Sequence, residues 1–102
     1  HLVLEALQAG ADPSRLHYWR DKVGREVDFV IPRRGGCDAI ECKWNAASFD
    51  PKGLAALRAL HPVGRNLVVV PHVRTHSRRF RELEVTFVPI EALADLVAPA
   101  RG

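Results

Sequence analysis

Two acidic residues and one lysine have the spacing of a site for a hard metal ion. Asp28 and Glu41 stand thirteen positions apart, and Lys43 follows Glu41 by two. Because side chains alternate along a strand, Asp28 should share a face with Glu26 and Val30, and Glu41 with Lys43. Two carboxylates converging from adjacent strands suit Mg²⁺ or Mn²⁺, and the lysine can touch the water or phosphate that such an ion holds. Spacing alone leaves open a simple ion pair between one acid and Lys43.

Three strands in the first half of the chain must position these side chains. Strand formers and alternating apolar residues predict strands over 16–20, 25–31 and 37–44. Turns are predicted between them, over 21–24 and 33–36. An apolar helical pattern over 1–8 precedes the strands. We therefore expect a helix and a three-stranded meander, with Trp44 on the face opposite Glu41.

The second half favours a helix, two further strands and a last helix. Asp50 and Pro51 suit the cap and first position of a helix that Pro62 ends. Its apolar stripe consists of Leu54, Leu57 and Leu60. The later elements are a buried strand over 66–70, a polar connection over 72–81, a strand over 85–88 and a helix from Pro89. The crossover helix lets the 66–70 strand lie parallel to a meander strand, which predicts an α/β fold with a mixed β-sheet flanked by helices.

The residues that carry chemistry resemble a known signature. Asp28 followed by Glu41-Cys42-Lys43 resembles the Asp…Glu-x-Lys motif of the PD-(D/E)xK nuclease superfamily, the restriction-endonuclease-like fold. The expected order of elements matches the αβββαβ core of that superfamily, with an extra strand and a C-terminal helix. More closely, the runs at 18–20, 24–30 and 39–43 resemble the C-terminal domain of unknown function 4143 of bacterial and archaeal AAA-type ATPases.

The resemblance implies roles for individual residues. Asp28 and Glu41 match the metal-binding acids, and Lys43 matches the lysine that orients the attacking water or steadies the charge on the phosphate. Glu5 stands where some members place an extra metal ligand on a helix. Val27 departs from the motif, which has proline before the aspartate.

A basic segment follows the buried strand. It contains Arg74, Arg78, Arg79 and Arg81, with Phe80 among them. Clustered arginines with an aromatic residue suit phosphate contacts and base stacking, whereas a solvated connection is the alternative. His72 and His76 lack a third ligand, so zinc is not predicted.

Composition limits the class of protein. The formal net charge is +3 and the sequence pI is about 9.3, which favours polyanionic partners. No apolar run is long enough for a membrane span, and residues 1–10 lack the features of a secretory signal. Cys37 and Cys42 should face opposite ways on one strand without a disulfide, which suits the cytoplasm. The chain contains no methionine and its apolar helical pattern begins at Leu2, so we interpret 1–102 as one domain of a longer protein. The resemblance implies that an ATPase precedes it, and the chain itself contains no phosphate-binding loop.

These observations lead to two hypotheses. The first is a Mg²⁺- or Mn²⁺-dependent nuclease-like domain acting on nucleic acid, with DNA favoured over RNA. The second is a catalytically inactive module that binds nucleic acid or protein and regulates the ATPase. Divalent-ion binding distinguishes them, and the oligomeric state, including a homodimer, is left open.

Overall fold

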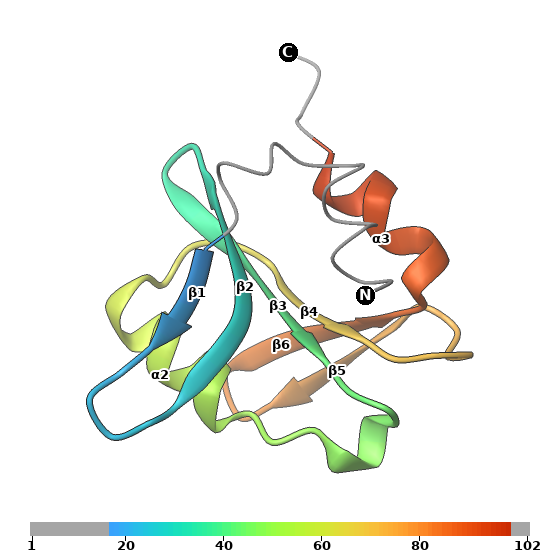
Figure 1. The fold of residues 1–102 in the computed structure, drawn as a ribbon, viewed down its shortest axis with the longest axis horizontal. Coiled ribbons are helices and arrows are strands. Elements are labelled where there is room, and N and C mark those ends of the chain that lie inside the picture. Colours follow the sequence, from blue (N-terminus) through green and yellow to red (C-terminus); the bar gives the residue numbers. More distant parts are fainter. Residues whose placement is uncertain (1–16, 99–102) are drawn as a thin grey trace.

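The computed structural model describes residues 17–98, which form a mixed six-stranded sheet with helices on both faces (Figure 1). The strands are β1 (His17–Arg20), β2 (Glu26–Arg33), β3 (Gly36–Cys42), β4 (Asn66–Val69), β5 (His76–Phe80) and β6 (Leu83–Val88). The helical elements are the short 3₁₀ turn η2 (Ala46–Ser48), α2 (Lys52–Leu60) and α3 (Ile90–Val97). The helix expected over 1–8, together with Glu5, lies outside the described residues.

The order of strands across the sheet is β1-β2-β3-β4-β6-β5. β1, β2 and β3 pair antiparallel, as predicted for the meander. β4 pairs parallel with β3, because α2 carries the chain back to the start of the sheet, and β6 pairs parallel with β4. The predicted α/β class and mixed sheet are thus confirmed.

One predicted connection is instead partly a strand. Residues 72–81 were expected to link two strands, but His76–Phe80 form β5, which pairs antiparallel with β6. The sequence pattern missed β5 because most of its residues are polar and exposed, as an edge strand permits.

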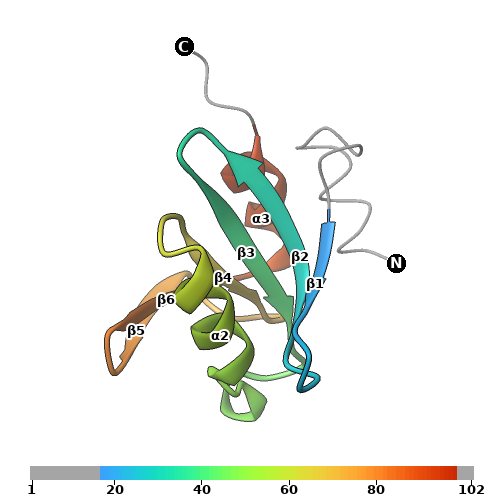
Figure 2. The same cartoon turned by 90° about the vertical axis from the view of Figure 1, so that its left-hand side faces the viewer.

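Two apolar clusters occupy the two faces of the sheet. Figure 2 shows α2 in front of the strands and α3 behind them. Leu54 and Leu57 of α2 pack on one face, and Leu93 and Val97 of α3 on the other. β4 contributes side chains to both clusters, which confirms that it is covered on both faces. Neither helix within 17–98 is long and apolar enough to span a membrane.

Both ends of α2 differ from the sequence pattern. The helix begins at Lys52, with Pro51 rather than Asp50 at the cap position, and the carboxylate of Asp50 accepts a hydrogen bond from the Lys52 N–H at 3.0 Å. Leu60, expected in the apolar stripe, is 66% exposed because the helix ends there and the chain turns away.

A buried acid fixes α3 to the sheet. Burial alone would raise the pKa of Asp38, but hydrogen bonds from Arg65 and Arg33 outweigh burial and hold that pKa below its ordinary value. The same two guanidinium groups donate to the carbonyl oxygens of Leu96 and Val97 at the end of α3. Asp38 is therefore an example of a buried charge whose hydrogen-bonding needs are met.

Candidate functional site

A bulge in β2 sets the position of Asp28. The β1–β2 register pairs Trp19 with Val27 and His17 with Val30, so two residues of β2, Asp28 and Phe29, lie opposite Tyr18 alone. Val27 accordingly packs on the α2 face and Phe29 on the α3 face. Strict alternation, which placed Val27 and Phe29 on one face and Asp28 with both Glu26 and Val30, is wrong here. Bulges commonly re-aim a side chain beside a functional site.

Asp28 bridges β2 to β3 where their regular pairing stops. The last backbone pair at this end of the two strands is Phe29 with Ile40. Beyond it, Oδ2 of Asp28 accepts a hydrogen bond from the Cys42 N–H at 2.9 Å. The carboxylate thus lies beside the segment of β3 that contains Glu41, on the neighbouring antiparallel strand as expected.

Glu41 is a buried acid whose hydrogen-bonding needs are not met. Its residue surface is 7% exposed, and Oε2 has no hydrogen-bond partner among the described residues. Burial, followed by the charge of Asp28, raises the pKa of Glu41 from 4.5 to about 7, with Lys43 opposing this shift and Asp50 adding slightly to it. Ionised Glu41 therefore lacks the charged hydrogen-bond donors that stabilise Asp38, and a bound cation would stabilise its carboxylate.

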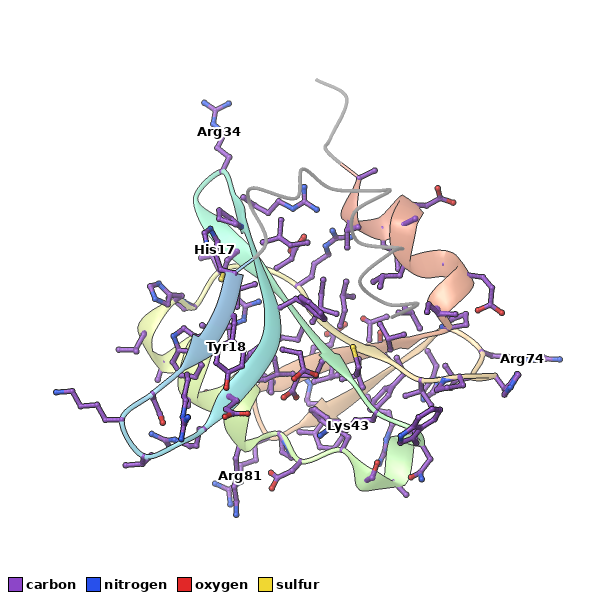
Figure 3. The ribbon with its side chains drawn as sticks, viewed as in Figure 1. His17, Tyr18, Arg34, Lys43, Arg74 and Arg81 are labelled. Atoms are coloured by element: carbon purple, nitrogen blue, oxygen red, sulfur yellow. The ribbon has the colours of Figure 1, made fainter. Side chains whose placement is uncertain are left out.

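Lys43 provides a positive charge beside this acid. Its N–H donates to the carbonyl oxygen of Val69 at 3.0 Å, which continues the β3–β4 pairing past the end of β3. Its ammonium forms no ion pair with any residue in the described range 17–98. The side chain, labelled in Figure 3, is thus free to take part in binding.

The chemistry of these donors fits a magnesium ion. Mg²⁺ is usually held by one or two carboxylates together with waters and substrate phosphates, so Asp28 and Glu41 suffice in type and number. The orphaned Oε2 of Glu41 is the observation that supports this fit. Within 17–98 no group of three histidines, cysteines or acids is close enough to hold a metal, so a third ligand such as Glu5 would have to come from elsewhere.

The four arginines of the basic segment do not form one patch. Arg78 lies over the rings of Phe80 and Phe87, at 5.1 and 5.8 Å, while Arg79 pairs with Glu84 at 3.8 Å. These neighbours on β5 point to opposite faces of the sheet. Arg74 and Arg81 lie at opposite ends of β5 (Figure 3).

The two histidines near this segment have structural neighbours. His76 stacks on Phe87, with ring centroids 5.1 Å apart, and its Nδ1 lies 2.7 Å from the carbonyl oxygen of Arg74. His72 adopts a left-handed backbone conformation with φ of 61° in the loop before β5. Within the described part of the chain, neither belongs to a cluster that could hold a metal.

Only one of the arginines lies at the same edge of the sheet as Lys43. Parallel strands end at a common edge, where α/β proteins commonly bind ligands. The register aligns Cys42 with Val69 and Val69 with Val88, so β3, β4 and β6 end together. The loop after β4 carries Arg74 at this edge, whereas the turn containing Arg81 lies at the opposite edge.

Trp44 is the residue at this edge that the sequence pattern misplaced. It was expected on a strand over 37–44, on the face opposite Glu41, but it lies outside β3 and is 87% exposed. β3 ends at Cys42, and Asn45 begins η2 by accepting a hydrogen bond from the Ser48 N–H at 2.9 Å. The Asn45-x-x-Ser48 spacing is the signal that could have placed Trp44 outside the strand.

The cysteines behave as expected. Cys37 and Cys42 are free and pack on opposite faces of the sheet. Burial, followed by the charges of Asp28 and Glu41, raises the pKa of Cys42 to about 12, so its thiol is unreactive.

Comparison with known proteins identifies the chain at the level of a family. A family model described as Domain of unknown function (DUF4143) matches residues 1–93. No curated protein and no solved structure matches the chain. The match covers Asp28, Glu41 and Lys43 but assigns no activity to them.

Proposed function

The chain belongs to the family of domain of unknown function 4143, and we propose that it is a magnesium-dependent nuclease-like domain that acts on the phosphodiesters of nucleic acids. The single observation that carries this proposal is Glu41, a buried acid with one unpartnered oxygen beside Asp28 and Lys43. A buried acid without a hydrogen-bond partner destabilises the fold, so its presence favours a functional role for the site over a structural one.

The proposal gives each of the three residues a task. Asp28 and Glu41 would hold the cation from adjacent strands, where Asp28 accepts a hydrogen bond from the N–H of Cys42, the residue after Glu41. When bound, Mg²⁺ supplies a water of lowered pKa and screens the charge of the scissile phosphate. Lys43 orients the attacking water or stabilises the phosphate through its ammonium group.

The order of strands and helices supports the proposal that the domain has a restriction-endonuclease-like core. β1, β2, β3, α2 and β4 follow the βββαβ order of a restriction-endonuclease-like core, with β3 and β4 parallel. β6, β5 and α3 are additions to that core. In the full-length protein we propose that this domain follows an AAA-type ATPase in the cytoplasm and acts on DNA.

The charge of Lys43 offers a test that separates chemistry from metal binding. We expect Lys43→Met to reduce metal-dependent cleavage by about a hundredfold to a thousandfold, since a cation that stabilises developing charge is lost while chain length is kept. Calorimetric Mn²⁺ binding should persist because both carboxylates remain. Lys52→Met, an exposed lysine in the first turn of α2, is the matched control. Loss of Mn²⁺ binding, or cleavage at the parental rate, would contradict the role assigned to Lys43.

Parent protein should be tested on duplex, single-stranded and branched DNA and on RNA, with Mg²⁺ and with Mn²⁺. Cleavage of any of these substrates, together with a calorimetric signal for the ion, is the expected result. If the parent protein neither cleaves any substrate nor binds either ion, the proposed nuclease activity is wrong and the regulatory module is favoured.

The placement of the arginines predicts unequal contributions to nucleic-acid binding. We expect Arg74→Ala to weaken binding and to reduce the slope of log K against log salt by about one contact, because Arg74 lies at the same sheet edge as Lys43. Arg81→Ala should change neither quantity, since Arg81 lines a groove at the other edge together with Glu82 and Glu84. Titrations at several salt concentrations measure both variants. Equal effects of the two substitutions would show that binding does not follow this edge.

A further inference from the structure

Trp44 is more exposed than any other large apolar side chain described. Its 87% exposure compares with 58% for Tyr18, while Trp19 packs against the apolar cluster on the α2 face. Leaving an indole in water forgoes the stabilisation of burying a large aromatic surface. Trp44 directly follows Lys43, so its backbone adjoins the residue that supplies the positive charge of the candidate site.

Two cations without ion pairs in the described residues, Lys43 and Arg74, lie at the same edge of the sheet as Trp44. Lys43 precedes it and Asn45 follows it. Arg74, in the loop after β4 at the same edge, is exposed and forms no ion pair within residues 17–98. A hot spot for a protein partner is usually an aromatic side chain inside an apolar, desolvated patch. An exposed indole at a sheet edge that also carries two unpaired cations suits a flexible polyanion with aromatic groups.

A second exposed aromatic residue lies on the other side of the acids. Tyr18 is on β1, and β1 lies about 10 Å from β3 across the sheet, while Trp44 lies further along, past the end of β3. Figure 3 shows Tyr18 and Lys43 on opposite sides of the middle of the meander. A hydrogen bond with Glu26, then burial and the nearby charges of Glu26 and Asp28, raises the pKa of Tyr18, so its ring stays neutral beside the site.

From this arrangement we propose that the domain binds single-stranded nucleic acid across the edge of the sheet, with Trp44 stacking on an unpaired base. This inference rests on the proposed function, since it names the substrate class of the same site. Duplex bases have their faces covered by their neighbours, so an indole can stack only on a base that is unpaired or displaced. Stacking on a base face tolerates any sequence, and Arg74 and Lys43 contact phosphates on either side.

Tryptophan fluorescence tests the stacking directly. The chain has two tryptophans, and Trp44→Phe leaves only the signal of Trp19. Titration with a thymidine oligonucleotide of about a dozen residues, in a chelator, should quench the emission of the parent but not that of Trp44→Phe. The same oligonucleotide annealed to its complement should produce no comparable quenching.

Affinity measurements supply the second readout. We expect Trp44→Ala to weaken binding of the oligonucleotide about tenfold and Trp44→Phe to retain most of the affinity, because a smaller ring still stacks. Val23→Ala, an apolar residue 75% exposed in the β1–β2 turn, is the matched control and should bind as the parent does. Equal quenching by duplex, or no effect of Trp44→Ala, would overturn the inference and favour a protein partner for this surface.

The chelator separates this inference from the proposed activity. If the single strand quenches the fluorescence but no divalent ion supports cleavage, the stacking inference stands and the proposed nuclease activity is wrong. Cleavage that is unaffected by Trp44→Ala, with no quenching, would retain the nuclease and overturn the stacking.

Discussion

Glu41→Gln should make the domain more stable at pH 8, although it removes a native side chain. The folded protein holds the proton of Glu41 more tightly than the unfolded chain does, because its pKa rises from 4.5 to about 7. The free energy of unfolding of the parent must therefore fall as pH rises from about 4.5 to about 7. Gln has the same shape and no charge, so the variant escapes this loss. The expected gain at pH 8 is on the order of 2 kcal/mol.

Urea unfolding at pH 4 and pH 8 measures the effect. The parent and Glu41→Gln should be equally stable at pH 4, where Glu41 is protonated in both states, and should diverge by pH 8. Glu82→Gln, which removes an exposed acid from the β5–β6 turn, is the control and should lack this divergence. A variant less stable than the parent at pH 8 would show that the carboxylate has a favourable partner, and the site would then be structural.

The same substitution should abolish the activity we propose. Removing one of two anionic ligands weakens Mg²⁺ binding strongly, so cleavage should be lost completely. Mg²⁺ should raise the unfolding midpoint of the parent at pH 8 through its binding to the folded state, and it should leave Glu41→Gln unchanged. Gain of stability together with loss of metal response would identify Glu41 as a residue retained for function at the expense of the fold.

Sequence patterns predicted the parts of this site that depend on long-range order. The apolar run at 66–70 indicated a buried strand, and a helical crossover before it allowed parallel pairing with a strand of the meander, which the structure shows to be β3. The meander placed Asp28 and Glu41 on neighbouring strands, as the structure shows. These features follow from periodicity and connection length, which a single sequence contains.

The same sequence patterns could not predict local departures from regular strand geometry. The bulge at Asp28 and Phe29 arises from the pairing of β2 with β1, and a strand cannot reveal its own register. The sequence pattern did not predict β5, because an edge strand needs only one neighbouring strand and no apolar face of its own. Trp44 was misplaced because alternation was extended past the true end of β3.

Close packing of α2 against β2 was equally invisible in the sequence, and it depends on one glycine. Gly53 is buried in the first turn of α2, where a Cβ atom would overlap the backbone carbonyl oxygen of Glu26. The same Cβ atom would lie 3.4 Å from Oε1 of Glu41. The absent side chain thus lets the start of the helix approach β2 and helps to bury Glu41.

Gly53→Ala should therefore destabilise the protein, although helix propensity predicts the reverse. Alanine in a helix is favoured over glycine by about 1 kcal/mol, whereas overpacking against a backbone that cannot rotate away costs about 1–3 kcal/mol. Displacement of α2 should also admit water to Glu41 and return its pKa toward 4.5, so that the fall in stability between about pH 4.5 and 7 becomes smaller. Urea unfolding across this pH range measures both effects, and Ala55→Gly, on the exposed side of α2, calibrates the propensity alone. A Gly53→Ala variant as stable as the parent, with the full pH dependence of Glu41, would show that α2 can shift without opening the site.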